Sequence, residues 1–230
     1  MMRFSDIHSH FVYGMDDGAQ TREEMEAMLD AAAADGIAKL IATPHMTPGI
    51  YPFDEERFRK HLDEAQEYCE RCGYGMELYS GAEILYTPTL EHYADGRRLI
   101  TLAHSEYVLL EFAPALSYQE IKSAVEMLGR SGYTPIIAHV ERYRELGGAR
   151  IYQLKEQTAV KYQMNCRTIL DGGGMIRNAR IRKWLRDELI DYVATDSHDC
   201  GHRRTCMKRT YELLVKQYGE LYADRLVSMI

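Results

Sequence analysis

Short apolar segments alternate with longer amphipathic segments along the whole chain, and this alternation predicts a parallel α/β fold. The apolar segments have the length of buried strands, whereas the longer segments repeat apolar residues every three or four positions, as helices do. A helix between two successive strands allows those strands to run parallel. The predicted strands are residues 5–10, 37–43, 76–80, 107–112, 134–138, 160–165 and 191–195.

Capping residues bound several of the predicted helices. Thr21 followed by Glu24 has the pattern of a capping box, and the helix that it opens ends at Gly36. Asp54 caps a second helix, which carries Cys69 on its apolar face. Further helices are expected from 121 to about 132, over 177–189 and from 204 to 230. Seven strands with helices between them favour a barrel over an open sheet.

The composition fits one domain over residues 1–230. Apolar residues make up 46% of the chain, which is enough to offset the entropy of folding. With no run of 18 apolar residues and no apolar signal segment, we expect no membrane insertion and a cytoplasmic protein. Acidic residues exceed basic ones by 35 to 28, which argues against nucleic-acid binding. The acidic excess does not exclude a small phosphate ester as ligand, because a bound metal ion would make the local charge positive.

Cysteines and glycines suggest no chemistry of their own. The chain has five cysteines, an odd number at irregular spacing, and without an export signal we expect reduced thiols. Cys69 and Cys72 form a lone C-x-x-C pair, which we interpret as two residues on the apolar face of a helix. The three glycines at 172–174 lack the lysine and hydroxyl of a phosphate-binding loop, so they predict a turn.

Imidazoles and carboxylates stand at the ends of six of the seven predicted strands. Carboxyl ends of parallel barrel strands lie on one face, where such enzymes place their active sites. Taken singly, His45 could be a hydrogen-bonded core residue, and Glu83 or Glu111 could belong to a buried salt bridge. The convergence of so many donors on one rim favours a metal site. The donors are His8, His10, His45, Glu83, Glu111, His139, Asp196 and His198.

These motifs resemble the PHP (polymerase and histidinol phosphatase) superfamily. The resemblance extends along nearly the whole chain and is closest to the bacterial manganese-dependent protein-tyrosine phosphatases of capsule and exopolysaccharide clusters. The superfamily motifs are Asp6-Ile7-His8-Ser9-His10, Thr43-Pro44-His45, Gly81-Ala82-Glu83, Ile137-Ala138-His139 and Ala194-Thr195-Asp196-Ser197-His198. The branch shows in Met15-Asp16-Asp17-Gly18, Glu111-Phe112 and His139-Val140-Glu141-Arg142-Tyr143. Met46 and the polar, basic segment 199–204 depart from the family pattern and bear on substrate preference.

The resemblance implies a distorted (β/α)7 barrel that holds three divalent metal ions. Manganese is the first expectation, with iron and zinc as alternatives. Arg142 and Arg203 would hold the substrate phosphate. The implied ligands are His8, His10, Glu83 and Asp196 for one ion, Glu83, Glu111 and His139 for the second, and Asp17, His45 and His198 for the third.

The predicted activity is that of a metal-dependent phosphotyrosine-protein phosphatase. Three dications, four carboxylates and two arginines give the site a charge of about +4, which suits a phosphomonoester dianion. We expect in-line attack of a metal-bridging hydroxide on phosphorus, with Arg142 and Arg203 stabilising the equatorial oxygens. His198 is one candidate for the general acid. The resemblance implies a phosphotyrosyl protein as partner, such as the tail of a bacterial tyrosine kinase.

Three other functions fit parts of the pattern. A histidinol-phosphate or other small-molecule phosphatase of the superfamily would share the same metal ligands. Amide or lactone hydrolysis on a related barrel is less favoured, because Glu83 and Glu111 occupy positions where a modified lysine would be expected. A non-enzymatic module that binds a kinase through a degenerate site is disfavoured by the intact ligand set. The sequence leaves open the physiological substrate, the native metal and whether the protein forms a homo-oligomer.

Overall fold

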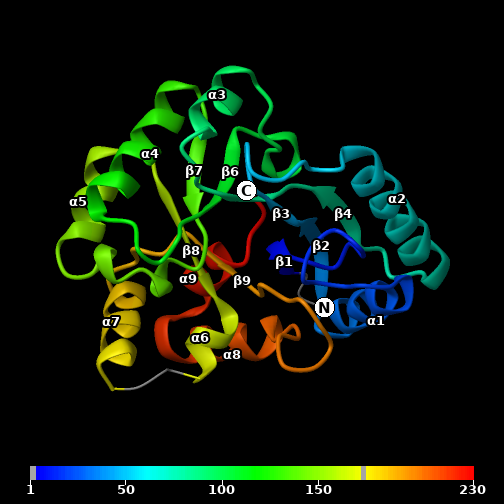
Figure 1. The fold of residues 1–230 in the computed structure, drawn as a ribbon. Coiled ribbons are helices and arrows are strands. Elements are labelled where there is room, and N and C mark those ends of the chain that lie inside the picture. Colours follow the sequence, from blue (N-terminus) through cyan, green and yellow to red (C-terminus); the bar gives the residue numbers. More distant parts are fainter. Residues whose placement is uncertain (1–3, 172–174) are drawn as a thin grey trace.

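The computed structural model describes residues 4–171 and 175–230 and shows parallel strands surrounded by helices (Figure 1). A three-stranded sheet has the order β1 (Phe4–Ser9), β2 (Ile37–Ala42) and β4 (Glu77–Ser80). A six-stranded sheet has the order β3 (His45–Met46), β5 (Glu83–Leu85), β6 (Tyr107–Glu111), β7 (Thr134–Ile137), β8 (Lys161–Asn165) and β9 (Tyr192–Ala194).

The two sheets form one curved barrel. β3 follows β2 and β5 follows β4 after two residues each, so the described strands occupy seven positions. β2 pairs with β4, and β3 pairs with β5 with His45 opposite Glu83. The first and last strands meet through a parallel bridge between Ser9 and Ser197, where His10 N donates to Ser197 O at 2.8 Å. The expected distorted (β/α)7 barrel is therefore confirmed, with two of its strands interrupted.

The interruptions have local causes. Pro44, in the first, has no N–H to donate to a neighbouring strand. Gly81, in the second, packs so closely that a Cβ would lie 2.7 Å from Leu102 Cδ2 and 2.8 Å from Ile41 Cγ2. Each strand therefore resumes two residues later, and His45 and Glu83 stand at the start of the resumed segments.

Helices cover the outside of the strands (Figure 1). The sequence predicts most of these helices but not α3, α5 or α6. Neither α3 nor α5 has a side-chain hydrogen bond at its N-cap, so the sequence carries no start signal there. The helices are α1 (Arg22–Ala34), α2 (Glu55–Cys72), α3 (Leu90–Asp95), α4 (Tyr118–Arg130), α5 (Arg150–Gln157), α6 (Cys166–Asp171), α7 (Met175–Arg186), α8 (Met207–Tyr218) and α9 (Glu220–Leu226).

The predicted N-caps are present, with one correction. Thr21 accepts from Glu24 N, but the Glu24 carboxylate accepts from Gln20 N at 2.6 Å, so only half of the expected capping box forms. A complete capping box instead opens α4, between Ser117 and Glu120.

The cysteine and glycine predictions have different outcomes. The five cysteines are free thiols, and Cys69 is buried on α2 as expected. Cys72 is exposed, so its placement on the apolar face was wrong. The turn predicted at 172–174 lies outside the described residues. Within the described chain no helix is both long and apolar enough to cross a membrane.

Two apolar clusters support the strands from opposite sides. The larger lies between strands and helices and includes Leu29 of α1, Phe58 of α2 and Leu128 of α4. The smaller joins side chains from β1, β2, β6, β7 and β9, which can meet only inside the barrel. This inner cluster fills the barrel beneath the strand ends and leaves the polar residues gathered above it. Its strand members are Ile7, Ile41, Leu109, Ile136 and Ala194.

Candidate metal centre

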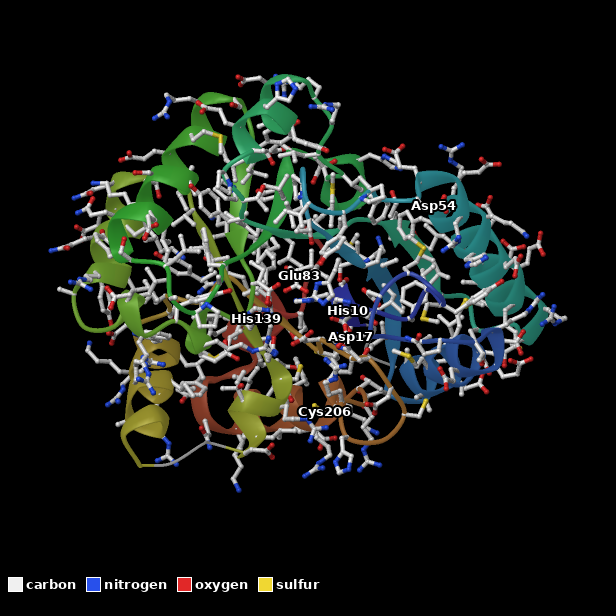
Figure 2. All side chains as sticks on the ribbon, viewed as in Figure 1. His10, Asp17, Asp54, Glu83, His139 and Cys206 are labelled. Carbon is white, nitrogen blue, oxygen red and sulfur yellow. The ribbon has the colours of Figure 1, made fainter. Side chains whose placement is uncertain are left out.

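The predicted donors meet at the carboxyl ends of the strands. Figure 2 shows Glu83, His139, His10 and Asp17 close together in the middle of the molecule. His10 directly follows β1, and Glu111 is the last residue of β6. His139 and Asp196 follow β7 and β9 with positive φ values of 32° and 53°, a backbone conformation that costs energy for residues other than glycine. At His139 and Asp196 the backbone therefore adopts this unfavourable conformation where it places a donor in the site.

Three overlapping groups of donor atoms each fall within 4.8 Å. Two of these groups agree with ligand sets that the resemblance implies. One matches the set for the first ion, and the other matches the set for the third ion with His10 added. The remaining group contains His45 with Glu83 and Glu111, whereas His139 Nε2 lies 2.8 Å from Glu83 and 3.6 Å from Glu111. All nine predicted donors thus belong to one cluster. The groups are His8, His10, Glu83 and Asp196; His45, Glu83 and Glu111; and His10, Asp17, His45 and His198.

Glu83 lies at the centre of the cluster, with 1% of its side chain exposed. One carboxylate oxygen lies 3.2 Å from His8 Nε2, 3.4 Å from His10 Nε2 and 3.2 Å from His45 Nδ1. Burial raises the pKa of Glu83, but the charge of His8 and hydrogen bonds to His10 and His139 lower it well below the ordinary value. Glu83 is therefore an anion that several imidazoles share.

The imidazoles of His8 and His10 are basic in the metal-free state. Burial lowers the pKa of His10, but hydrogen bonds with Asp16 and Glu83 outweigh it and raise the pKa to about 10. The pKa of His8 is also raised, because Glu83 and Asp196 outweigh its burial. Protons on these imidazoles thus balance the buried carboxylates, and a cation that binds here would replace them.

Four imidazoles use Nδ1 for an outer partner and turn Nε2 toward the centre. Metal-binding histidines have this arrangement, because the outer hydrogen bond fixes the ring and its tautomer. The donor set, imidazoles and carboxylates without thiolate, fits divalent ions of intermediate to hard character. The outer contacts of Nδ1 are His8 to Gln163 Oε1 at 3.2 Å, His10 to Asp16 Oδ2 at 2.7 Å, His139 to the Tyr143 hydroxyl at 3.4 Å and His198 to Asp196 O at 2.9 Å.

His198 is held as a neutral imidazole. Its ring stacks on His10 with the centroids 3.8 Å apart. Burial, together with the charge of His10, lowers the pKa of His198 to about 4. A neutral imidazole at pH 7 suits a metal ligand, and it does not suit a general acid.

The two predicted phosphate-binding arginines lie at the rim of the cluster, both about half exposed. Arg142 donates to Asp196 Oδ2 at 2.6 Å, and Arg203 donates to Asp17 Oδ2 at 2.7 Å. Both line a cavity of about 290 Å³, together with Arg167 of α6, which the sequence had not singled out. The arginines therefore stand where an anion could reach both them and the buried donors.

Asp16 has a role that the sequence did not reveal. The sequence marked the acidic turn but assigned chemistry only to Asp17. In the structure Asp16 accepts from the backbone N–H groups of His45 and Gly18 at 2.9 and 2.8 Å, besides its bond to His10. Burial raises the pKa of Asp16, but the hydrogen bond and charge of His10, together with the N–H groups of Gly18 and His45, outweigh it and lower the pKa to about 2. The two adjacent aspartates were the available signal, but their division of roles depends on contacts across the barrel.

Comparisons with known proteins identify relatives with phosphatase names. Residues 4–229 match the sequence model of a family described as capsular polysaccharide synthesis, CpsB/CapC. The tyrosine-protein phosphatase CpsB of Streptococcus pneumoniae is 29% identical over 227 residues, which cover 96% of this chain and 93% of the relative. The tyrosine-protein phosphatase YwqE of Bacillus subtilis is 29% identical over 216 residues, which cover 93% of this chain and 85% of the relative.

Solved structures agree with these relationships. A structure from a study of YwqE and CpsB, described as unique metal-dependent tyrosine phosphatases, matches with a TM-score of 0.86 and 28% identity over 96% of this chain and 90% of the other. A histidinol phosphate phosphatase from Lactococcus lactis matches with a TM-score of 0.60 and 12% identity over 95% of each chain. The second likeness shows a shared fold only.

Proposed function

This chain belongs to the CpsB/CapC family of capsular polysaccharide synthesis, and we propose that it is a metal-dependent phosphotyrosine-protein phosphatase. The observation that carries the proposal is a buried cluster of imidazole and carboxylate donors with two arginines at its rim. The cluster suits cations, the arginines suit a phosphate, and the named relatives are tyrosine phosphatases.

We assign the nine clustered donors as ligands of three divalent ions, with manganese as the expected metal. His8, His10, Glu83 and Asp196 would hold one ion, and Glu83, Glu111 and His139 would hold the second. Asp17, His45 and His198 hold the third, with His45 close enough to Glu83 to lie between the second and third sites. When bound, such ions stabilise charge on phosphoryl oxygens and lower the pKa of water to about 7.

Arg142 and Arg203 would orient the phosphate. Each guanidinium has five N–H donors in a fixed plane, and its bond to a ligand carboxylate holds that plane at the rim. The remaining donors can bind phosphoryl oxygens, and their positive charge offsets the charge that develops on the equatorial oxygens.

The state of His198 favours an aryl phosphate over an alkyl one. A phenolate leaves with a pKa of about 10 and needs little help from an acid, whereas an alkoxide needs a proton donor. As a proposed ligand of the third ion, His198 would give its Nε2 lone pair to the cation and would not serve as that proton donor. The preferred substrate would therefore be a phosphotyrosyl protein. The partner that fits best is a tyrosine kinase of the same polysaccharide system, which this protein would meet in the cytoplasm.

The proposal is tested with protein loaded with manganese. It should hydrolyse p-nitrophenyl phosphate and a phosphotyrosyl peptide, and a chelator should stop both reactions. Arg142→Ala should slow turnover while Arg144→Ala, an exposed arginine two residues away, should not. Faster hydrolysis of histidinol phosphate than of phosphotyrosine would replace this proposal with a small-molecule phosphatase.

A further inference from the structure

β8 is the barrel strand to which the sequence assigned no ligand, yet it contributes two buried amides to the site. Gln163 and Asn165 are two residues apart, so both side chains lie on the same side of the strand. Gln163 is fully buried and Asn165 is 6% exposed. Buried amides are costly unless their donors and acceptors are matched, so their partners show what they hold in place.

The two amides connect ligands on three other strands through one chain of hydrogen bonds. Gln163 Oε1 accepts from the backbone N–H of His139 at 2.8 Å and lies 3.2 Å from His8 Nδ1. Gln163 Nε2 donates to Asn165 Oδ1 at 2.8 Å. Asn165 Nδ2 then donates to Asp196 Oδ2 at 2.7 Å.

The direction of every bond follows from one backbone donor. The N–H of His139 can only donate, so the Gln163 atom that it meets must be the carbonyl oxygen. That oxygen can only accept, so His8 must carry a proton on Nδ1, which leaves Nε2 as the atom that would bind a cation at the centre. The Gln163 nitrogen in turn fixes the orientation of the Asn165 amide.

The last bond orients the carboxylate of Asp196. Its Oδ2 receives two donors, Asn165 Nδ2 and Arg142. Its other oxygen, Oδ1, lies 3.4 Å from His8 Nε2 and 3.6 Å from His10 Nε2 and thus points to the centre. This series of hydrogen bonds therefore directs His8 Nε2 and Asp196 Oδ1 toward the same point, although the two residues lie on opposite sides of the seam between β1 and β9.

We propose that Gln163 and Asn165 are positioning residues that act as one relay, fixing the tautomer of His8 and the orientation of Asp196 for the ion that these two ligands share. The inference rests on the proposed metal-dependent function and adds residues to its site. Removal of outer partners of metal ligands typically costs about 10- to 100-fold in metal affinity or activity. We expect a loss of this size in Mn²⁺ affinity from either amide.

The experiment measures Mn²⁺ affinity directly, by competition with a fluorescent chelator, in Gln163→Ala, Asn165→Ala and the double variant. Each single variant should bind one Mn²⁺, the ion shared by His8 and Asp196, about 10- to 100-fold less tightly. The double variant should lose little more, because the first substitution already interrupts the relay. For Gln163→Ala, at a residue that does not line the cavity beside Arg142, kcat should recover at saturating Mn²⁺ while the KM for p-nitrophenyl phosphate stays unchanged. Gln153→Ala, an exposed amide on α5, is the matched control.

Gln163→Glu tests the direction of the relay. A carboxylate can still accept from His139 and His8, but it cannot donate to Asn165, whose amide must then turn its oxygen toward Asp196. This variant should therefore weaken Mn²⁺ binding about as much as Asn165→Ala does. Should Gln163→Ala fail to fold, Asn165→Ala and Gln163→Glu carry the test.

Two results would overturn the relay. One is unchanged Mn²⁺ affinity in variants whose urea midpoints fall, which would mean that the amides only support the fold. The other is a loss in the double variant equal to the product of the two single losses, which would mean independent roles. A wild-type protein that binds no Mn²⁺ would instead refute the proposed function itself.

Discussion

Glu83→Gln is the substitution that tests the centre most directly. It keeps the shape of the side chain and removes the one anion that lies within 3.4 Å of His8, His10, His45 and His139. In the metal-free protein His8 and His10 lose one of the carboxylates that compensate their charge, while Asp196 and Asp16 remain. In the loaded protein two of the three proposed ions lose a ligand.

The size of the effect follows from burial. Glu83 is 1% exposed, so solvent screens its interactions little. Removing one partner of a buried ion pair costs about 3–5 kcal/mol, which is about two to three and a half powers of ten in an equilibrium constant. A domain is typically stable by about 5–15 kcal/mol, so the variant should still fold.

Three measurements separate the consequences. Urea unfolding of chelator-treated protein should show a loss of about 3–5 kcal/mol relative to wild type. Elemental analysis after manganese loading should show that only the third proposed ion, with Asp17, His45 and His198, is retained. Hydrolysis of p-nitrophenyl phosphate should fall below detection.

Glu91→Gln, an exposed position on α3, is the control and should change none of these measurements. A Glu83→Gln protein with the full manganese content and a wild-type rate would refute the reasoning, because Glu83 would then not bridge the ions. An unfolding free energy equal to that of wild type would refute the electrostatic account of the metal-free state.

The remaining predictions concern the rim, the protons and the backbone of the site. Arg142→Ala should lower turnover of aryl phosphates about 100-fold while elemental analysis finds manganese unchanged; loss of metal would show that Arg142 instead secures Asp196 as a ligand. Because the pKa of His10 is raised from 6.5 to about 10, its protonated form stabilises the metal-free fold at and below pH 6.5, and this contribution disappears as the pH rises to about 10. The urea midpoint of chelator-treated protein should therefore fall over that range, and a rising midpoint would contradict the assignment. Gly18→Ala places a Cβ 2.1 Å from His10 O and should destabilise the protein by about 1–3 kcal/mol, whereas Gly129→Ala, which meets no atom within 4 Å in α4, should stabilise it by about 0.5–1 kcal/mol. Equal effects at the two glycines, measured by thermal unfolding, would show that the close approach at Gly18 is relieved without cost.

Sequence reasoning reached the donor cluster because two independent signals pointed to the same place. Apolar runs such as 107–112 mark strands without knowledge of their neighbours, and parallel topology then brings the strand ends together. His139 and Glu111 could be identified as donors of one cluster in this way, although neither lies in a motif that is specific on its own. For the donors at strand ends, residue type and strand position were enough, because a barrel leaves only one face for these ends, whereas Asp17 was reached only through the family resemblance.

The relay of Gln163 and Asn165 could not be found in the same way. An amide in a weakly apolar strand has no distinctive chemistry, and its role depends on partners far away in the chain. Gln163 lies 155 residues from His8, with which it shares a hydrogen bond. Such a contact is visible only once the register of β8 against its neighbours is known. The short helices α3 and α5 were missed for a related reason, since no local side-chain cap marks their start.

The seam between β1 and β9 has a consequence for biosynthesis. His8 and His10 are translated before the other donors of the cluster, whereas Asp196 and His198 are translated after them, and Asp196 N donates to His8 O at 2.9 Å across the seam. A nascent chain still attached to the ribosome therefore holds only part of the centre until its final strand has left the exit tunnel. The proposed metal centre is therefore complete only after β9 and the residues that follow it have been made, and a fragment ending before β9 would lack Asp196 and His198.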